Sequence, residues 1–156
     1  MQKSLRLRVV VCLILLGLAS GVNAADDGAH PEAVGEARAV MQRFIETFNA
    51  RDESAWADTL LFPHVRVASG SAVVIEDKQT FVASTDLEQF ALDNNWDFSQ
   101  WDAMEVVHAG PEKVHFKVIF SRFNPQGERY ATFDSLYILQ KVDGRWGIRA
   151  RSSFAP

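Results

Sequence analysis

Hydrophobic residues recur at three- and four-residue spacing in a stretch that runs from Pro31 to about Asn49. Its apolar positions are Val34, Ala37, Val40, Met41, Phe44, Ile45 and Phe48. That spacing predicts an amphipathic α-helix, and Pro31 suits its first turn, where a missing N–H leaves no hydrogen bond unmade. Asp52 can cap a second, short helix over residues 53–60, which would bury Trp56.

The middle of the chain predicts two short strands and then a third helix, over residues 64–67, 72–75 and 78–93. The strands alternate polar and apolar residues, and a Ser-Gly-Ser turn separates them. Asp77 can cap the helix. Thr85 and Glu88 match a capping box, so we expect this helix to restart there.

The last third of the chain predicts only strands, which cover residues 102–109, 112–123, 128–142 and 145–154. Asn-Pro-Gln-Gly at 124–127 and Asp143-Gly144 are strong turn signals between them. Helices first and a long antiparallel meander last indicate the α+β class. We expect a curved, mostly antiparallel sheet wrapped around three N-terminal helices, which is a cone with a pocket at its open end.

The turns set the register of this meander, and the register decides which side chains share a face. A two-residue loop at 143–144 predicts Tyr137 opposite Ala150 and Ser135 opposite Ser152. A four-residue loop in the preceding hairpin predicts Phe116 opposite Ser135. A single β-bulge would move part of a strand to the other face.

One face of the meander is nearly all apolar, and we expect it to face the helices and the pocket. The candidate ligand-binding residues on that face are Phe116, Phe120, Ser135, Tyr137 and Ser152. The other face mixes charged and aliphatic residues and includes Arg149 and Arg151. We expect that outer face to be solvated or to form a homodimer.

The first 24 residues have the features of a secretory signal peptide. Three basic residues precede an apolar run from Val9 to Leu18, and small residues follow up to Ala24. The run is shorter than the about 20 residues that cross a bilayer, and a retained interfacial anchor is the alternative. We therefore predict cleavage after Ala24, a secreted or periplasmic protein, a flexible stretch at 25–30 and one domain at 31–154.

Charge and cysteine content narrow the function classes. The predicted signal carries Lys3, Arg6, Arg8 and no acidic residue, so a net charge of −4 becomes −7 after cleavage. An acidic domain is a poor partner for nucleic acids and anionic membranes. The single cysteine, Cys12, leaves with the signal, which excludes disulfides and thiolate metal sites. The four histidines lack metal-ligand spacing and no phosphate-binding glycine loop is present, so we expect no metal and no cofactor.

Two stretches resemble a known family. One contains Phe-Asn-Ala-Arg-Asp at 48–52 and Phe-Pro-His-Val-Arg at 62–66, and the other ends with Asp-Gly-Arg-Trp-Gly-Ile at 143–148. With them, the domain resembles the SnoaL-like members of the nuclear transport factor 2-like superfamily. The resemblance implies a conical α+β barrel, frequent homodimers, and a pocket that binds ligands or performs cofactor-free isomerisation, dehydration, epoxide hydrolysis or cyclisation.

The chain departs from the catalytic patterns of that superfamily. Ketosteroid isomerase-like members carry a catalytic carboxylate on the first strand, where residues 64–69 of this chain contain no acid. The Asp-Arg-Asp set of the epoxide hydrolases has no clear counterpart either. This strand therefore lacks the carboxylate on which the ketosteroid isomerase mechanism depends.

His64 and Arg66 are the candidate catalytic residues, because they share the side of the first strand that would carry the superfamily's catalytic position. Histidine exchanges a proton near neutral pH, and arginine can hold a carboxylate or an enolate-like oxygen. Trp56 and Trp96 could wall the mouth of the pocket. The alternatives are a histidine bonded to backbone, an arginine in a surface ion pair, and tryptophans that only pack.

For two acidic residues of the predicted strands, the sequence does not decide whether the side chain faces the pocket. Asp134 is either a buried catalytic carboxylate or the partner of Lys117 in a cross-strand ion pair, and the ion pair is favoured. Glu105 faces the pocket only if the turn at Gly110-Pro111 has an even loop, and burial would then raise its pKa.

Three functions fit these observations. The first is an exported protein that binds a small, partly apolar, oxygenated ligand in a pocket. The second is a cofactor-independent lyase or isomerase that uses His64 and Arg66. The third is a dimeric interaction module that uses the outer face of the sheet.

Overall fold

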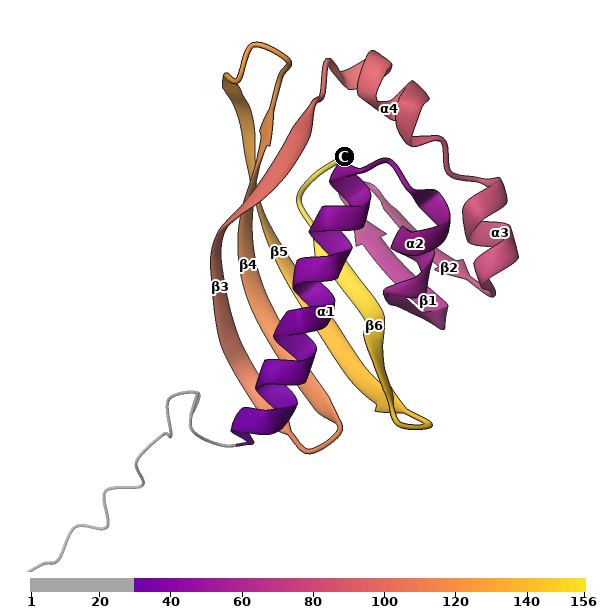
Figure 1. Cartoon of the computed structure of the whole chain (residues 1–156), viewed down its shortest axis with the longest axis vertical. Coiled ribbons are helices and arrows are strands. Elements are labelled where there is room, and N and C mark those ends of the chain that lie inside the picture. Colours follow the sequence, from indigo (N-terminus) through magenta and orange to yellow (C-terminus); the bar gives the residue numbers. More distant parts are fainter. Residues whose placement is uncertain (1–29) are drawn as a thin grey trace, which may run out of the picture.

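The computed structural model describes residues 30–156, so the predicted signal peptide and residues 25–29 lie outside the described residues. These residues form four helices and six strands (Figure 1). In chain order they are α1 (Pro31–Asn49), α2 (Glu53–Asp58), β1 (Leu60–Ala68), β2 (Ser71–Ile75), α3 (Lys78–Ala83), α4 (Leu87–Asn94), β3 (Phe98–Gly110), β4 (Lys113–Phe123), β5 (Arg129–Val142) and β6 (Arg145–Ser153). Within this part of the chain, every helix is too short or too polar to span a bilayer.

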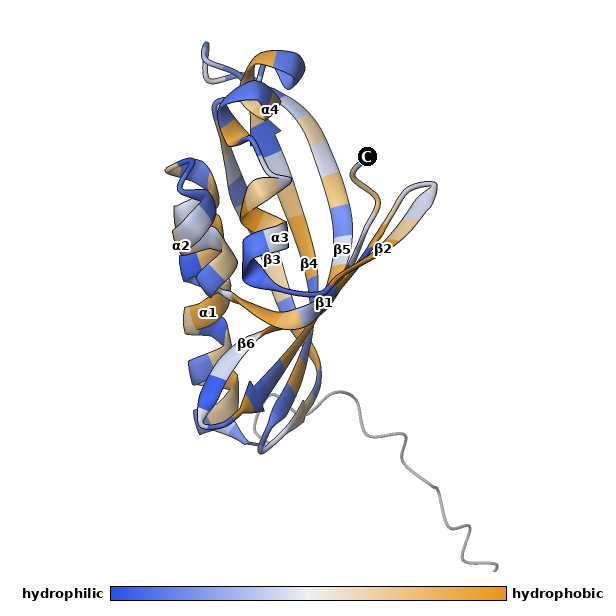
Figure 2. Ribbon diagram, turned by 90° about the vertical axis from the view of Figure 1, so that its right-hand side faces the viewer, coloured by the Kyte–Doolittle hydropathy of each residue, from blue (hydrophilic) through white to orange (hydrophobic). Residues whose placement is uncertain are grey.

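The six strands form one sheet in the order β2-β1-β6-β5-β4-β3. Neighbouring strands are antiparallel except β1 and β6, which are parallel. The sheet is curved and unclosed, and α1 lies along its concave side while α2 and α3 lie near β1 and β2 (Figures 1 and 2). The expected α+β class with a curved, mostly antiparallel sheet is confirmed.

The core lies between α1 and the concave face of the sheet. The apolar positions of α1 that the spacing singled out are buried, apart from the half-buried Phe48. Opposite them, the side chains of Phe116, Tyr137, Leu139 and Ile148 are almost inaccessible to solvent. Figure 2 shows hydrophobic and hydrophilic residues alternating along the long strands, as expected for a sheet with one buried face.

The predicted third helix is two helices. Asp77 caps α3 as expected, because its carboxylate accepts from the backbone N–H of Thr80 at 2.7 Å. The cap of α4 is Asp86, which accepts from the N–H of Gln89 at 2.7 Å, and not Thr85. The Thr85 hydroxyl instead donates to the carbonyl oxygen of Phe81, so the predicted capping box does not form.

The first strand of the sheet begins earlier than predicted. The second helix ends at Asp58, and Leu60 already belongs to β1, where it pairs with Ile148 of β6. β3 likewise begins at Phe98 and not near residue 102. Both differences arise because pairing with a neighbouring strand extends the strand beyond its alternating segment.

The register of the hairpin between β4 and β5 differs from the prediction by two residues. Phe116 lies opposite Tyr137 and not opposite Ser135, because a five-residue loop and a bulge at Tyr130 replace the expected four-residue loop. A shift by two keeps every side chain on its face. The predicted inner residues of β4 and β5 therefore do point toward the helices.

The register between β5 and β6 differs in a way that does change the faces. Ile138 pairs with Ala150 and Leu139 with Ile148, which leaves Arg149 as an extra residue in a bulge. Tyr137 therefore lies opposite Arg151 and not opposite Ala150, and Ser135 lies opposite Ser153 and not Ser152. Beyond this bulge the predicted faces of β6 are wrong: Arg151 points into the cone and Ser152 points away from it.

Candidate functional site

A small cavity lies inside the cone, between α1, α2 and the concave faces of β3 to β6. Its volume is about 40 Å³, which is room for about three water molecules. Aromatic rings form most of its wall, from Phe44, Phe48, Trp56, Trp101 and Phe120. The polar groups that reach it belong to Ser99, Arg122, Tyr137 and Arg151.

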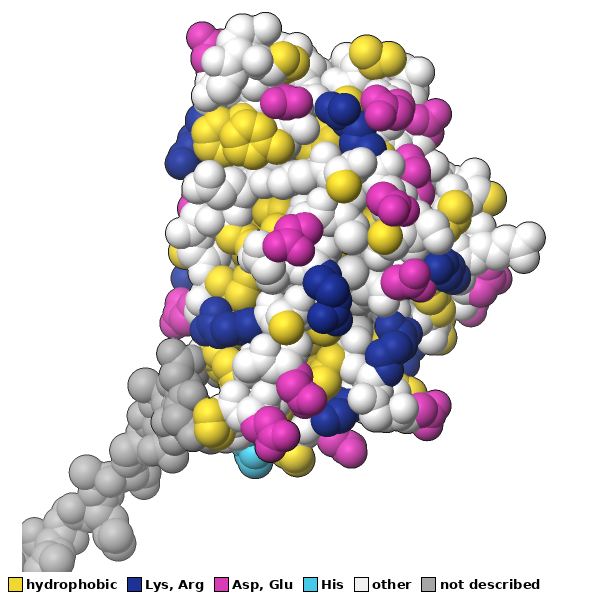
Figure 3. Space-filling model, viewed as in Figure 1, with side chains coloured by type: hydrophobic (Ala, Val, Ile, Leu, Met, Phe, Trp, Pro, Cys, Tyr) yellow, Lys and Arg dark blue, Asp and Glu magenta, His cyan; other side chains and the backbone are white. Residues whose placement is uncertain are grey.

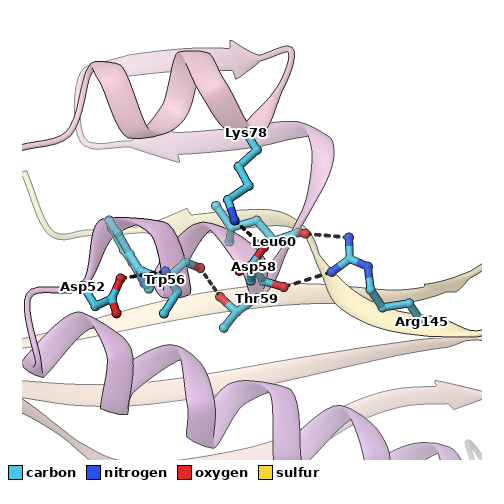
Figure 4. Close-up of polar contacts among 8 residues, drawn as sticks. Asp52, Trp56, Asp58, Thr59, Leu60, Lys78 and Arg145 are labelled. Atoms are coloured by element: carbon cyan, nitrogen blue, oxygen red, sulfur yellow. Dashed lines mark hydrogen bonds and ion pairs between the residues drawn. The ribbon is translucent and has the colours of Figure 1, made fainter.

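Polar contacts around α2 fix the position of Trp56 in this wall (Figure 4). Asp52 caps the helix by accepting from the N–H of Ala55 at 2.9 Å. At the other end, Arg145 of β6 donates to the carbonyl oxygens of Asp58 and Leu60 at 2.9 and 3.0 Å. The indole of Trp56 then packs on Phe44, Phe48 and Phe81, with ring centroids 4.9 to 5.3 Å apart.

Arg122 of β4 is the most buried cation of the site, with 8% of its surface exposed. Its guanidinium lies between the rings of Phe90 and Phe133, 5.0 and 5.1 Å from their centroids. Burial lowers its pKa and the nearby charge of Arg151 acts in the same direction, while Tyr130 opposes them. Its Nε–H is buried and has no hydrogen-bond acceptor within residues 30–156.

Arg151 of β6 enters the cavity because of the bulge at Arg149. Its guanidinium lies 5.5 Å from the ring centroids of both Phe44 and Trp56, and its Nε–H is also buried without an acceptor among the described residues. The Tyr137 hydroxyl lies beside it. Burial raises the pKa of Tyr137, whereas the charge and contact of Arg151 act against that rise.

Arg66 of β1 is the third cation at this end of the cone. Its Nη2 donates to a main-chain oxygen of Pro156, the last residue of the sequence, at 3.1 Å. Burial lowers its pKa, and the charges of Arg151 and Arg122 lower it further. We call Arg66, Arg122 and Arg151 the arginine cluster.

The arginine cluster has no Asp or Glu partner in the part of the chain that the structure describes. The five ion pairs found there join other residues. On the face seen in Figure 3, basic and acidic side chains are interspersed. The three guanidinium groups of the arginine cluster therefore lie close together inside an acidic protein, and no acidic side chain of the described residues neutralises them.

His64 of β1 is buried, with 1% of its surface exposed. Its Nδ1 lies 3.1 Å from the carbonyl oxygen of Ile148, which places the proton on Nδ1 and leaves the buried Nε2 without a partner among residues 30–156. Burial, followed by the charge of Arg151, lowers its pKa to about 4. The ring is therefore neutral at pH 7 and a weak base.

The structure brings together only some of the residues that the sequence singled out. Trp56, Phe120 and Tyr137 line the cavity, whereas His64 and Arg66 lie outside its wall. The charge of Arg151 acts on both of them, and Arg66 also interacts with Arg122 and Tyr137.

The remaining predicted ligand-binding residues lie elsewhere. Trp96 is buried and donates to the hydroxyl of Ser99 at 3.0 Å. Phe116 is a core residue, and Ser135 is buried against Ser153, with 2.8 Å between the two hydroxyl oxygens. Ser152 is exposed on the outer side of β6, so its predicted place in the pocket wall is wrong.

The two acidic residues whose face the sequence left undecided both point away from the cavity. Asp134 and Glu105 are both exposed on the outer face of the sheet. Asp134 lies opposite Ile119 and Glu105 opposite Lys117, so the favoured ion pair between Asp134 and Lys117 does not form. Within residues 30–156, no group of three or more His, Cys, Asp or Glu residues is placed to hold a metal ion.

Sequence reasoning missed Arg122 and Arg151, which dominate the polar part of the site. Arg122 continues the inward alternation of Val118 and Phe120, so extending that pattern by one step would have found it. Arg151 could not be found in this way, because no sequence signal marks the bulge at Arg149.

The fold is an NTF2-like cone, and aromatic and arginine side chains line the cavity inside it. The family model described as NTF2-like protein (DUF6841) matches residues 35–154, and the chain belongs to this family. No curated protein matched the chain.

Solved structures share the fold at low sequence identity. An NTF2-like protein of unknown function from Pseudomonas putida is 15% identical, with a TM-score of 0.67 over 83% of this chain and 90% of that one. An NTF2-like protein with a cystatin-like fold from Novosphingobium aromaticivorans is 10% identical, with a TM-score of 0.66 over 80% and 82%. A ketosteroid isomerase-like protein from Erwinia carotovora atroseptica is 19% identical, with a TM-score of 0.57 over 80% and 98%.

Proposed function

We propose that this protein is exported and binds a small, partly apolar, oxygenated molecule inside the cone. The observation that carries the proposal is the cavity, in which five aromatic rings surround the Arg122, Tyr137 and Arg151 side chains. Binding sites for small molecules are usually concave and apolar, with a few polar groups that fix orientation.

The cavity is small for such a ligand, since sites for drug-sized molecules usually enclose about 300–1,000 Å³. Its volume of about 40 Å³ fits only the polar end of a ligand. The body of the ligand would displace aromatic side chains at the wall. We propose that Phe48 is the ring displaced, because it is only half-buried and packs against Phe90 of α4.

A thermal-shift and tryptophan-fluorescence screen tests this proposal. The panel contains benzoate, benzamide, acetophenone and benzyl alcohol, which share a ring and differ in their oxygen group. We expect at least one to stabilise the protein and to change the fluorescence of Trp56 or Trp101. The variant Ile45→Phe adds volume at a cavity-lining residue and should abolish the effect.

Leu92→Phe provides the matched control, because it adds an aromatic ring to an exposed position of α4. It should leave binding unchanged. The proposal fails if no compound binds, or if Ile45→Phe and Leu92→Phe bind every compound equally well.

Catalysis by His64 and Arg66 is the second candidate, and the unpartnered Nε2 of His64 is the observation in its favour. A pKa of about 4 makes His64 a weak base, and it lies outside the cavity wall, so we rank binding first. His64→Ala separates the two, because it should leave ligand affinity nearly unchanged in a binder but abolish turnover in an enzyme.

We also propose that the outer face of the sheet forms a homodimer. Leu136 and Val142 of β5 are each more than a third exposed on the strand that lies near the middle of the sheet. Light scattering on the purified protein should then give twice the monomer mass, and Leu136→Lys should return it to the monomer mass.

A further inference from the structure

The cavity of the cone offers hydrogen-bond donors that its own protein does not use. Arg122, Arg151 and Trp56 line the cavity. The Nε–H groups of the two arginines and the Nε1–H of the tryptophan are buried and have no acceptor among residues 30–156. Arginine and tryptophan side chains are donors only, and a buried donor without an acceptor is unfavourable. The complement of such a site is a group that only accepts.

Charge points to the same kind of group. The arginine cluster places two guanidinium groups at the cavity and a third, Arg66, near enough for their charges to lower its pKa. No Asp or Glu side chain among the described residues pairs with any of them. Removing cations from water is costly unless an anion neutralises them, and a carboxylate does so with paired, charge-assisted hydrogen bonds.

The aromatic wall argues for an organic anion and not an inorganic one. Phe44 and Trp56 flank the guanidinium of Arg151, and Trp101 and Phe120 continue the apolar surface. An apolar ligand body would bury its surface against these rings, a gain that phosphate or sulfate cannot make.

We propose that the cone selects organic carboxylates, with the carboxylate held between Arg122 and Arg151 and an apolar, preferably aromatic, body against the rings. This inference rests on the proposed function, because it names the charge and class of the ligand. It goes beyond the proposed function by excluding neutral ligands, because a neutral molecule of the same shape would leave the arginine cluster unpaired.

Calorimetric titration of the purified protein with benzoate and with benzamide tests this directly, because the two probes have the same ring and nearly the same shape. We expect benzoate to bind at least about tenfold more tightly, and inorganic phosphate not to displace it. In an NMR titration, benzoate should shift the Nε–H resonances of Arg122 and Arg151, because these groups acquire an acceptor.

Arg122→Met and Arg151→Met remove one charge each and keep an unbranched apolar side chain. Each should lower the affinity for benzoate at least about tenfold and leave that for benzamide nearly unchanged. Arg129→Met is the matched control: Arg129 pairs with Asp102 at 3.2 Å and also lies over an aromatic ring, that of Phe123, but does not line the cavity.

Different results would overturn the carboxylate inference and the proposed binding function. Equal affinity for benzoate and benzamide in the wild-type protein, displacement of benzoate by phosphate, or full benzoate affinity in both methionine variants would overturn the carboxylate inference while the binding function stands. Failure of every compound of the panel to bind would overturn the proposed function itself. The wild-type comparison does not depend on how well the variants fold.

Discussion

His64 illustrates how burial determines the state of a single residue in this protein. Its ring lies against the backbone of β6, and its pKa is lowered to about 4 by burial first and by the charge of Arg151 second. In the unfolded chain a histidine has a pKa of about 6.5. As the pH falls below 6.5, the unfolded state therefore binds a proton that the folded state binds only near pH 4.

The free energy of unfolding should consequently decrease as the pH falls from 6.5 toward 4. Between pH 7 and pH 5, His64 should account for a loss of about 2 kcal/mol. His64→Asn retains a nitrogen that can donate to the carbonyl oxygen of Ile148 but does not titrate, so it should lack this component. Urea unfolding followed by tryptophan fluorescence at the two pH values measures the difference.

His108→Asn is the control for this experiment, since His108 is exposed on the outer face of the sheet. It should keep the full pH dependence of the wild-type protein. If His64→Asn loses as much stability between pH 7 and pH 5 as the wild-type protein does, His64 does not titrate as described.

At the scale of elements, the contact between β1 and β6 depends on a missing side chain. A Cβ atom at Gly147 would lie 2.8 Å from Cγ of Leu61 and 3.2 Å from the carbonyl carbon of Leu60. Gly147→Ala should therefore lower the free energy of unfolding by about 1–3 kcal/mol, because the two strands must separate slightly. Chemical denaturation measures this loss.

Gly35 in α1 provides the opposite case. A Cβ atom there would meet nothing within 4 Å, and the residue is exposed within a helix. Gly35→Ala should raise the free energy of unfolding by about 0.5–1 kcal/mol, since alanine loses less backbone entropy on folding. A Gly147→Ala protein at least as stable as the wild-type protein would contradict the close contact described at Gly147.

The elements also show how far the sequence alone predicts this molecule. Periodicity predicts α1 and the long strands, and turn sequences predict the hairpins, because these signals are local. The bulge at Arg149 depends on how β6 meets both β5 and β1, so no local pattern reports it. Because of that one residue, Arg151 and not Ser152 faces the interior. The fold could therefore be predicted from local signals, but the part of the site that β6 contributes could not.

At the scale of the whole molecule, the cone separates an acidic exterior from a positively charged interior. The chain has a net charge of −4, yet the arginine cluster lies inside it without an Asp or Glu partner in residues 30–156. An anionic ligand would therefore have to pass an acidic surface to reach a cationic site. High salt should weaken the repulsion between the ligand and the acidic surface. The same screening should also weaken the attraction between the ligand and the arginine cluster.

Export is a second prediction at the scale of the whole molecule. We predict that cells which produce the full chain release a protein that begins at Ala25, because the first 24 residues match a cleaved signal. Intact-mass spectrometry of the extracytoplasmic fraction measures this. A chain of full mass, retained in the cytoplasm, would contradict the prediction, and Ala24→Trp should block processing because a large residue stands at the cleavage point.

The central claim is that the interior of the cone holds an organic carboxylate between Arg122 and Arg151. A crystal structure of the protein with bound benzoate tests it most directly. We predict density for the carboxylate within about 3 Å of both guanidinium groups, with the ring against Phe44 or Trp56. Benzoate bound only on the outer face of the sheet, with the cavity unchanged, would contradict the claim.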